Sequence, residues 1–467
     1  MRLYNTLTRS KEPLKPVVEG KVGIYACGPT VYDYFHIGNA RVFIIFDVLR
    51  RYLAYRGYKV TFVQNFTDID DKMIKRANEM GISVNELAER FIDAYKEDTV
   101  SLGILPADHH PRATEHIPQI IDLIEKLMEK NLAYEVDGDI YFHVDAFPEY
   151  GRLSQQDLEE LDLGSRVGVD HRKKHPMDFA LWKSVKSGEP SWESPWGLGR
   201  PGWHIECSAM SMQYLGATID IHAGGQDLIF PHHENEIAQS QGASGQPFAR
   251  HWVHVGYLNI DQEKMSKSLG NVLTIRELRK KTDPMALRFF MLSAHYRTPV
   301  NFSGEYLDQA VRALERLNTV IYNLKNALTR VTEGNPDHDE SALLSSLAES
   351  RVRFLEAMDD DFNTAEGLAV LFELAKKTNI YLNRSEGQKK EILEPILTFY
   401  EEIDSIFDFI KKDSTILKKE VEELIAKRDE FRRSKDFASA DAIREELKEK
   451  GILLEDTPQG VRWKAIT

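Results

Sequence analysis

Two short β-type runs flank one amphipathic helical run near the N-terminus, and this pattern constrains the fold more than any other feature of the chain. Residues 22–27 are Val-Gly-Ile-Tyr-Ala-Cys, and residues 60–65 are Val-Thr-Phe-Val-Gln-Asn. The apolar positions between 39 and 56 follow the helical period, and Gly57 is placed to end that helix. A strand, a helix and a second strand form a βαβ unit, which predicts a parallel sheet of the Rossmann type.

The sheet is expected to resume after a long interruption. A further strand is predicted at 218–222, ahead of a helix that begins near Pro231. The interruption contains helical patterns at 83–102 and 112–130, a strand at 139–144 and a Gly- and Pro-rich stretch at 187–202. We therefore expect a catalytic domain made of two chain segments, with an inserted subdomain between them.

The rest of the chain is mostly helical. A helical pattern runs from Glu305 with a polar link at 334–339, and the end of the chain predicts two helices and a hairpin of strands at 451–454 and 461–464. The expected fold is α/β: a Rossmann-type parallel-sheet catalytic domain with an inserted subdomain, then a helical bundle and a small mixed α/β C-terminal module. The expected parts are 1–110 with 201–250 (catalytic), 111–200 (connective insertion), 251–310 (linking subdomain), 311–410 (bundle) and 411–467 (C-terminal module).

Composition excludes several classes of protein. The 467 residues carry 60 basic and 74 acidic side chains, a net charge of −14, which argues against a bulk nucleic-acid binder. Near the N-terminus the longest apolar run is 42–46, far below the ~20 residues of a membrane span, and the first residues lack the apolar core of a secretory signal. Only two cysteines are present, so we expect a cytoplasmic protein without disulfides and without a membrane contact.

The negative charge is not spread evenly. Residues 411–467 carry 14 basic and 13 acidic side chains, so the acidity lies in residues 1–410. Two clusters in the terminal module, Arg432-Arg433 and Arg462-Trp463-Lys464, are candidates to contact phosphates and to stack on a nucleic-acid base. A solvated helix face and a packed Trp463 are the alternatives.

Two segments have the chemistry of a polyphosphate site. His36-Ile37-Gly38-Asn39 lies where the first strand passes into its helix, and a helix N-terminus offers free N–H groups and a positive potential to phosphate. Residues 263–270 are Glu-Lys-Met-Ser-Lys-Ser-Leu-Gly, in which Lys264, Ser266 and Lys267 suit a loop that closes over a leaving pyrophosphate. The alternatives are a histidine that only caps its helix and a solvated lysine loop.

Cys27, Cys207, His232 and Glu236 form a candidate zinc site, because zinc accepts thiolate, imidazole and carboxylate ligands. Cys27 closes the first strand, so it is expected at the carboxyl edge of the sheet, where ligands of such folds bind. His232 and Glu236 are four residues apart and share a helix face. The alternatives are two cysteines buried as small hydrophobic residues, or other ligands from the same segments: His233, Glu234 and Glu206.

The two polyphosphate segments resemble the paired HIGH and KMSKS signatures of class I aminoacyl-tRNA synthetases. Four other segments are similar to hallmarks of the cysteinyl-tRNA synthetase family, and the similarity covers essentially the whole chain. They are Thr-Asp-Ile-Asp-Asp-Lys (67–72), Gly-Trp-His-Ile-Glu-Cys (202–207), Phe-Pro-His-His-Glu-Asn-Glu (230–236) and Met-Asp-Asp-Asp-Phe-Asn-Thr (358–364).

The resemblance implies a monomeric ligase that activates L-cysteine with ATP to cysteinyl adenylate and transfers it to the 3′ end of tRNA(Cys). One zinc ion per chain would bind the substrate sulfur, magnesium would accompany ATP, and residues 411–467 would recognise the anticodon. The implied catalytic and ATP-binding residues are His36, Gly38, Asn39, Lys264, Ser266 and Lys267. The implied cysteine pocket consists of Gly28, Thr67, Trp203, His222 and Asp227.

Some residues keep a second interpretation. Asn39 stands where the HIGH signature has its second histidine; asparagine donates a hydrogen bond but cannot be protonated, so we expect Lys264 and Lys267 to supply the charge. Catalytic zinc usually has three protein ligands, so four would require five-coordination or a loosened Glu236. Trp203 could pack in the core, and Asp227 could cap a helix. The acidic run 68–71 is expected to be a helix N-terminus rather than a magnesium site.

Two rival functions remain at this stage. A cysteine ligase of thiol-cofactor biosynthesis resembles the same catalytic half but uses an amino-sugar acceptor, which does not need the helices from 311 or the terminal module. A catalytically silent scaffold would not need Lys264, Lys267 or the candidate zinc ligands. The helices from 311 and the terminal module argue against the cofactor ligase, and the lysines and candidate zinc ligands argue against the scaffold. The synthetase is therefore the favoured interpretation.

Overall fold

The computed structural model divides into two compact units, residues 1–409 and residues 410–467. The structure describes residues 1–156, 172–260, 263–264, 273–384, 387–410, 415–449, 452–457 and 460–465. Within these ranges, the structure has no helix that is both long enough and apolar enough to cross a membrane.

Four parallel strands form the sheet that the βαβ pattern predicts. Strands β3 (Lys21–Ala26), β4 (Lys59–Gln64), β9 (Ile219–Gly225) and β10 (Ala249–Val255) are arranged in the order β10–β9–β3–β4. Helix α1 (Ile37–Tyr55) joins β3 to β4, so the predicted helix is confirmed. The expected return of the sheet is also confirmed, because β9 and β10 are hydrogen-bonded into it beside β3.

Helix α1 is buried around most of its circumference. It packs against β4 and β9 of the sheet and against two later helices, α9 (Pro284–Leu292) and α13 (Lys390–Phe407). A helix enclosed on several sides needs apolar side chains beyond one stripe. This enclosure explains why its sequence is richer in apolar residues than a surface helix.

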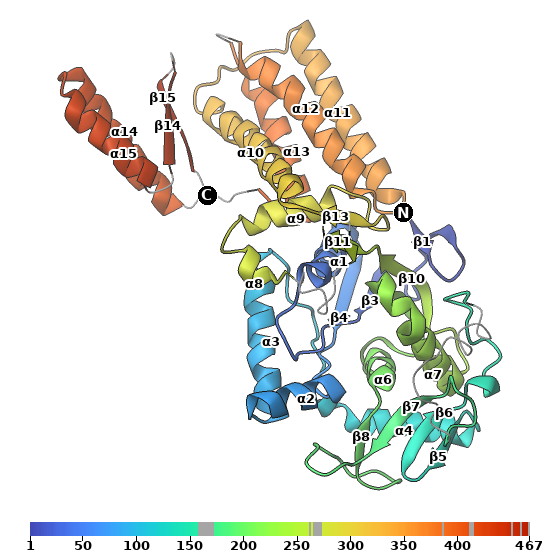
Figure 1. Cartoon of the computed structure of the whole chain (residues 1–467). Coiled ribbons are helices and arrows are strands. Elements are labelled where there is room, and N and C mark those ends of the chain that lie inside the picture. The colour runs from blue at the N-terminus through green and yellow to red at the C-terminus, as the bar shows by residue number, and fades with distance from the viewer. Residues whose placement is uncertain are drawn as a thin grey trace. The chain divides into compact units, whose positions relative to one another are not determined.

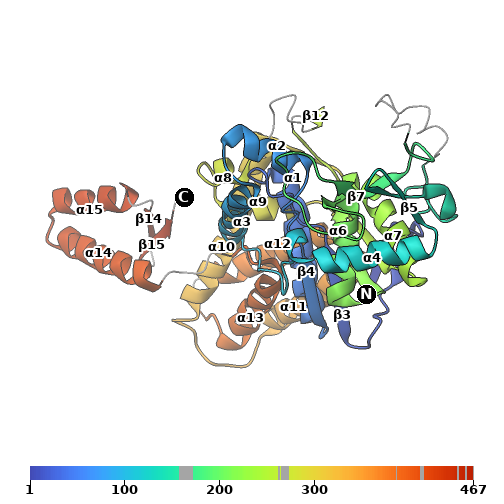
Figure 2. The same cartoon turned by 90° about the horizontal axis from the view of Figure 1, so that it is seen from below.

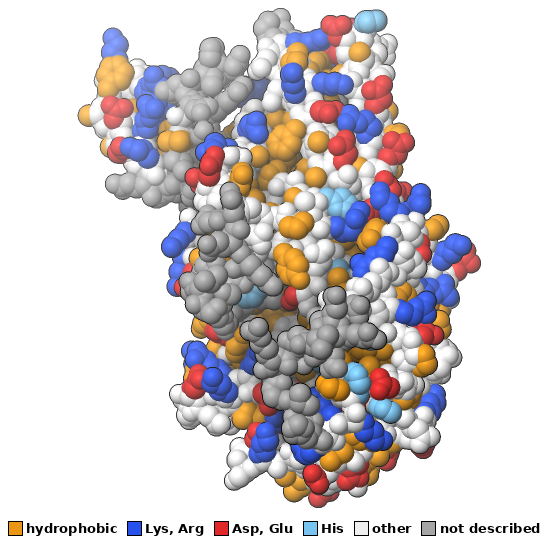
Figure 3. Space-filling view, turned by 45° about the vertical axis from the view of Figure 1, so that its right-hand side comes forward, with side chains coloured by type: hydrophobic (Ala, Val, Ile, Leu, Met, Phe, Trp, Pro, Cys, Tyr) orange, Lys and Arg blue, Asp and Glu red, His pale blue; other side chains and the backbone are white. Residues whose placement is uncertain are grey.

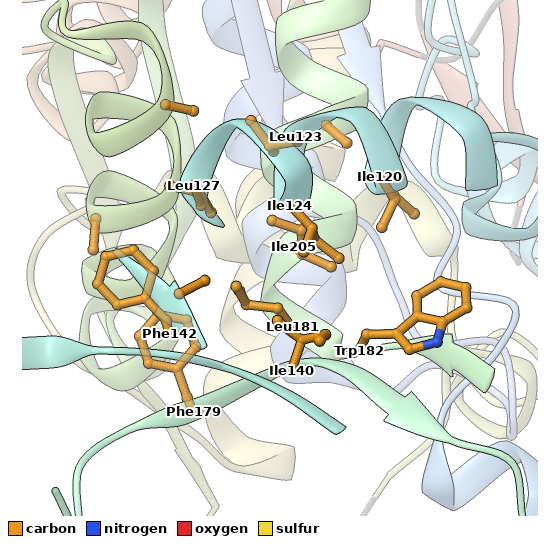
Figure 4. Close-up of a cluster of buried hydrophobic side chains, with 14 of the residues drawn as sticks. Ile120, Leu123, Ile124, Leu127, Ile140, Phe142, Phe179, Leu181, Trp182 and Ile205 are labelled. Atoms are coloured by element: carbon orange, nitrogen blue, oxygen red, sulfur yellow. The ribbon is translucent and has the colours of Figure 1, made fainter. Parts of the chain in front are cut away.

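The interruption of the sheet forms a second sheet with its own core. Strands β5 (Ala133–Val136), β6 (Asp139–Phe142), β7 (Phe179–Ser184) and β8 (Gly199–Pro201) pair antiparallel in that order. Helix α4 (Ile117–Glu129) covers them through a buried apolar cluster (Figure 4). The cluster includes Ile120, Leu123, Ile124, Leu127, Ile140, Phe142, Leu181, Trp182 and Ile205. Because Ile205 belongs to α6 (Trp203–Leu215), this core reaches the helix that follows the inserted sheet.

Capping explains where several helices begin. Asp70 caps α2 (Asp71–Met80) by accepting from Met73 N at 2.7 Å, which confirms that the acidic run at 68–71 is a helix N-terminus. Ser83 and Glu86 form a capping box at the start of α3 (Val84–Ser101). The remaining short elements of this half are β1 (Arg2–Asn5), β2 (Ser10–Pro13), α7 (Glu234–Ser244), β11 (Leu258–Ile260), β12 (Glu263–Lys264), α8 (Ile275–Leu278) and β13 (Val300–Phe302).

A helical bundle completes the first unit. It contains α10 (Gly304–Ala327), α11 (His338–Asp359), α12 (Thr364–Leu382) and α13, and it lies at the opposite end of this unit from β5–β8 (Figure 1). The predicted polar link lies between α10 and α11, where Asp337 caps α11 by accepting from Glu340 N at 2.8 Å. Basic and acidic side chains alternate over the face of the bundle that Figure 3 shows.

The second unit is a helical hairpin with a two-stranded ribbon, and Figure 2 labels all four of its elements. Helices α14 (Thr415–Arg433) and α15 (Phe437–Glu449) precede β14 (Ile452–Thr457) and β15 (Gly460–Ala465), which pair antiparallel. The two helices and the hairpin predicted for the end of the chain are therefore confirmed. A small apolar core joins them: Ile443, Leu447 and Leu454 are buried, and Leu424, Ile425, Val461 and Trp463 pack on them.

Candidate metal centre and active site

Four side chains from distant parts of the chain meet in one buried cluster. Cys27 follows β3, Cys207 lies on α6, His232 lies in the turn before α7, and Glu236 lies on α7. One ligand atom from each lies within 4.8 Å of those of the others, and all four residues are buried. The structure therefore brings together the residues that the sequence proposes as zinc ligands.

The backbone around Cys27 leaves no room for another side chain. A Cβ atom at Gly28 would lie 1.7 Å from the carbonyl oxygen of Asn65, which follows the neighbouring strand β4. The Gly28 N–H donates to Asn65 Oδ1 at 2.9 Å. Glycine therefore lets the ends of β3 and β4 approach each other closely, and this approach holds Cys27 at the carboxyl edge of the sheet.

The turn that carries His232 is less regular than the sequence predicts. The regular helix begins at Glu234, after a π-type turn at Ile229–His233 in which Phe230 is extended (φ −135°, ψ 134°). Residues before proline avoid helical backbone angles, so Pro231 accounts for this break. The two candidate ligands still face one site, since His232 Nε2 lies 3.1 Å from Glu236 Oε1.

Further histidines hold the candidate ligands in place. His222 Nε2 lies 2.8 Å from Glu236 Oε2, and the His222 ring stacks on Trp252 with centroids 4.4 Å apart. On the other side, His204 Nδ1 lies 2.8 Å from His232 Nδ1. Such outer contacts fix the orientation of metal ligands. His204 lies inside the quoted segment 202–207, but its role could not be derived from spacing.

The alternative ligands separate by geometry. Glu234 accepts from Ser154 N at 2.8 Å, so its carboxylate binds the backbone of another segment. Within the described ranges, two groups of side chains could hold a metal ion, and Glu206 belongs to neither of them. His233 Nε2 lies 3.3 Å from Cys27 Sγ, and His233 belongs to a second group with Cys27, His222 and Glu236. Glu236 and Cys27 are common to both groups.

The buried ionisable groups of the cluster shift one another's pKa values. Burial raises the pKa of the Cys27 thiol, which donates to the Cys207 sulfur and thereby lowers the pKa of Cys207 to about 6. Burial disfavours charge on His232 and Glu236, but their mutual attraction raises the pKa of His232 to about 10 and, with His222, lowers that of Glu236 to about 2. These directions describe the cluster without a metal ion. A metal ion bound here would displace the protons of Cys27 and His232, because thiol and imidazole bind metals in their deprotonated forms.

Three further residues of the expected cysteine pocket differ in burial and in contacts. Thr67 is buried, and its backbone bonds the segment after Cys27: Thr67 N donates to Pro29 O at 3.2 Å. Trp203 lies with its ring 4.5 Å from that of His232 and remains 39% exposed, so it is not a core residue. Asp227 is exposed in the turn Gln226–Leu228. The two helical segments that follow, Ile229–His233 and α7, have no side-chain cap at their N-termini, so Asp227 does not cap a helix.

His36 and Asn39 form a capping box at the start of α1. Asn39 N donates to His36 Nδ1, and His36 N donates to Asn39 Oδ1, both at 3.3 Å. Because Nδ1 accepts, the proton of a neutral His36 ring lies on Nε2. Both residues are half-buried, as is Gly38, so the first turn of α1 reaches the surface of the site.

The residues that follow the second signature are hydrogen-bonded to the first signature. Lys264 lies in β12, which pairs with β11, whereas the predicted site residues Ser266 and Lys267 lie outside the described residues. On the far side of that segment, Ile37 N donates to Leu273 O at 2.9 Å, and His36 forms a β-bridge with Thr274. Residues far apart in the sequence are therefore joined at the N-terminus of α1.

The candidate tRNA-binding residues of the terminal unit differ in their exposure to solvent. Arg432 and Arg433 are exposed at the end of α14, whereas Trp463 packs partly on the core of the unit. The side chains of Arg462 and Lys464 lie outside the described residues. Phe437, which begins α15, is 62% exposed, and the composition alone did not single it out.

Comparison with known proteins extends this picture. Family models match residues 13–312 (tRNA synthetases class I (C) catalytic domain), 353–411 (DALR domain) and 415–463 (cysteinyl-tRNA ligase anticodon binding domain). The cysteine–tRNA ligase of Geobacillus thermodenitrificans is 56% identical over 464 residues, which cover 99% of each chain. That of Clostridioides difficile is 54% identical over 467 residues, covering 100% of each.

A solved structure agrees on the fold. Methionyl-tRNA synthetase of Mycobacterium tuberculosis, in complex with methionyl-adenylate, superposes with a TM-score of 0.62 over 83% of this chain and 89% of that chain, at 16% identity. The predicted fold class is thereby confirmed as that of a class I synthetase. The chain, a ligase, belongs to the cysteine–tRNA ligase family of class I aminoacyl-tRNA synthetases.

Proposed function

We propose that the chain activates L-cysteine with ATP to cysteinyl adenylate and transfers it to the 3′ end of tRNA(Cys), with zinc selecting the substrate thiolate. The observation that carries this proposal is the buried group of Cys27, Cys207, His232 and Glu236 at the carboxyl edge of the parallel sheet. Membership of the family supports it, because the relatives are cysteine–tRNA ligases over their full length.

The donor set of this cluster fits zinc. Two sulfurs, one imidazole and one carboxylate are ligands that zinc accepts, and the excess negative charge of the cluster favours a dication. When bound, one zinc ion per chain would supply a Lewis acid that takes a thiolate sulfur in preference to the hydroxyl oxygen of serine. The hydrogen bond from His222 would keep Glu236 turned toward the ion by one oxygen.

The N-terminus of α1 is the proposed nucleotide site. Its first N–H groups and positive dipole end suit phosphate, and Gly38 lets the ligand approach the backbone. His36 and Asn39 would hold the phosphates of ATP, which magnesium would accompany, and the segment with Lys264, Ser266 and Lys267 would neutralise the leaving pyrophosphate.

The proposed reaction needs no side-chain nucleophile. The cysteine carboxylate attacks the α-phosphorus of ATP in line and pyrophosphate leaves; the 3′-terminal adenosine hydroxyl of tRNA then attacks the adenylate carbonyl. Gly28, Thr67, Trp203, His222 and Asp227 would bind and orient the amino acid. Catalysis then rests on positioning and electrostatic stabilisation.

The terminal unit is the proposed anticodon contact. A family model for anticodon binding matches 415–463, and exposed Arg432 and Arg433 offer charge to phosphates. We propose that exposed Phe437, at the start of α15, offers a stacking surface, in addition to Arg462, Trp463 and Lys464. A monomer in the cytoplasm is the expected working form.

The test is a pair of assays on the purified, zinc-loaded protein. Cysteine should support ATP–pyrophosphate exchange while serine does not, and tRNA(Cys) should be charged with cysteine. Cys207→Ala should lose zinc and exchange together, whereas Ser154→Ala, which keeps the backbone N–H that binds Glu234, should retain both. Cysteine activation without transfer to tRNA(Cys), or full exchange by the zinc-free protein, would contradict the proposal.

A further inference from the structure

The hallmark segment 358–364 joins α11 to α12, and its three carboxylates bind three different parts of the first unit. Asp359 accepts from Tyr52 Oη at 2.8 Å near the end of α1. Asp360, which is exposed, pairs with Lys11 at 2.8 Å. Asp361 is fully buried, and its carboxylate binds Tyr4 of β1 and Tyr296, which precedes β13. The segment is thus more than a connection between two helices.

The Asp361 carboxylate is saturated with donors. It accepts from Tyr4 N at 2.8 Å, from Tyr296 Oη at 2.7 Å, and from Arg297 Nε at 2.8 Å and Nη2 at 2.6 Å. Bonds between charged partners are stronger than neutral ones, and the Asp361 carboxylate is fully buried, although the Arg297 side chain is 34% exposed. The positions of Tyr296 and Arg297 are therefore set by Asp361.

The backbone at Asp361 is itself held in an uncommon conformation. Asp361 and Phe362 have φ values of 64° and 53°, in the left-handed region that side chains rarely adopt. The Asp361 N–H donates to Arg2 O at 2.9 Å, and Phe362 is buried. Such conformations persist when the surroundings impose them, and they mark places where geometry matters to the protein.

The segment that Asp361 holds is bonded to the start of α1. Arg41 lies two residues after Asn39 and is fully buried. It donates to Thr298 O at 2.6 Å and to Tyr296 O at 3.3 Å. It also donates to Gly256 O at 2.7 Å, and Gly256 N in turn donates to Tyr296 O at 2.8 Å. One continuous hydrogen-bonded path thus leads from Asp361 through Tyr296 to Arg41.

We propose that Asp361 is a positioning residue for the nucleotide end of the active site, acting through Tyr296 and Arg41 on the first turns of α1. The helical bundle then contributes to ATP binding without touching ATP. This inference rests on the proposed function of His36 and Asn39. It does not extend to the cysteine pocket, whose candidate ligands lie on other elements: the end of β3, α6 and α7.

The test compares two Michaelis constants in cysteine-dependent ATP–pyrophosphate exchange by the full-length, zinc-loaded protein. Asp361→Asn should raise the KM for ATP about fivefold or more and leave the KM for cysteine and the zinc content unchanged, because small misplacements of positioning groups carry large kinetic costs. Tyr296→Phe removes one hydrogen bond and should shift the KM for ATP in the same direction, by less. Asp360→Asn, in the same turn, is the matched control and should change neither constant.

Each outcome decides the matter. If Asp361 serves stability alone, Asp361→Asn will lower the melting temperature and leave the KM for ATP unchanged, or it will change both Michaelis constants together. Either result would overturn the proposal. If Asp361→Asn fails to fold, Tyr296→Phe with no change in the KM for ATP overturns it equally. His36→Ala separates the two levels: if it leaves the KM for ATP unchanged, the proposed nucleotide site itself is wrong.

Discussion

His222→Phe isolates one hydrogen bond that supports the candidate metal site. Phenylalanine keeps a flat ring against Trp252, on which the histidine stacks with an interplanar angle of 18°. It removes the 2.8 Å contact between His222 Nε2 and Glu236 Oε2, and both residues are fully buried. The change therefore removes the support of a ligand and keeps an aromatic ring at this position, although phenylalanine is larger than histidine.

The expected magnitude follows from two independent considerations. Removing a partner that orients a metal ligand costs about 10–100-fold in metal affinity. This loss corresponds to about 1.4–2.8 kcal/mol, and leaving a buried acceptor without its partner costs about 1–3 kcal/mol. We therefore expect zinc to bind His222→Phe one to two orders of magnitude more weakly. We also expect a loss of about 1–3 kcal/mol in the free energy of unfolding, because Glu236 loses its partner with and without zinc.

Competition between the protein and a zinc chelator, with bound metal as the readout, measures this loss directly. The KM for cysteine in pyrophosphate exchange should rise at limiting zinc. The part of this rise that added zinc reverses reports the metal site, and the part that persists reports the proposed contact of His222 with cysteine. His251→Phe is the matched control, since His251 is also buried in the sheet but belongs to neither candidate metal group. An unchanged zinc affinity in His222→Phe would refute this account of Glu236.

Four further substitutions test other parts of the protein. Gly28→Ala should lower the melting temperature and the zinc content, because its Cβ would lie 1.7 Å from Asn65 O. Asn39→His should change the exchange rate by less than about tenfold, or ~1.4 kcal/mol of barrier, since Asn39 serves as a neutral hydrogen-bonding group. Arg432→Ala and Arg433→Ala should weaken tRNA binding and each reduce its salt dependence by about one unit of slope, with exchange unchanged.

Each of these has a result that would count against it. A stable, zinc-replete Gly28→Ala would show that the ends of β3 and β4 can separate without harm. A larger gain in Asn39→His would mean that the site requires a cation there. Loss of exchange in the arginine variants would show that these residues act through folding rather than through tRNA.

Local patterns were sufficient to predict the main elements. The apolar period predicted α1 and its flanking strands, and the acidic run at 68–71 was correctly assigned to the start of α2. Where prediction failed in detail, a local cause is visible: Pro231 interrupts the helix expected to begin there, so regular α7 starts at Glu234. These features depend on neighbours in the chain and need no knowledge of the fold.

Residue type and spacing also identified a set of candidate metal ligands, but they could not choose among neighbours. His232 and His233 are adjacent, and only the fold shows that the first approaches Glu236 at 3.1 Å while the second approaches Cys27 at 3.3 Å. Likewise Glu234 is excluded because its carboxylate binds the backbone of Ser154. Such choices depend on which strand lies beside which.

The amino-acid sequence was thus enough to establish the fold class and the family resemblance and to predict the chemistry of the site, since these reside in periodicity, capping and residue type. The tertiary structure alone decided that donor atoms from β3, α6 and α7 converge, that His222 and His204 support them, and that Asp361 is connected to α1. The physical reason is range. Periodicity and capping act over a few residues, whereas these contacts require the close packing of segments that only the completed sheet and bundle bring together.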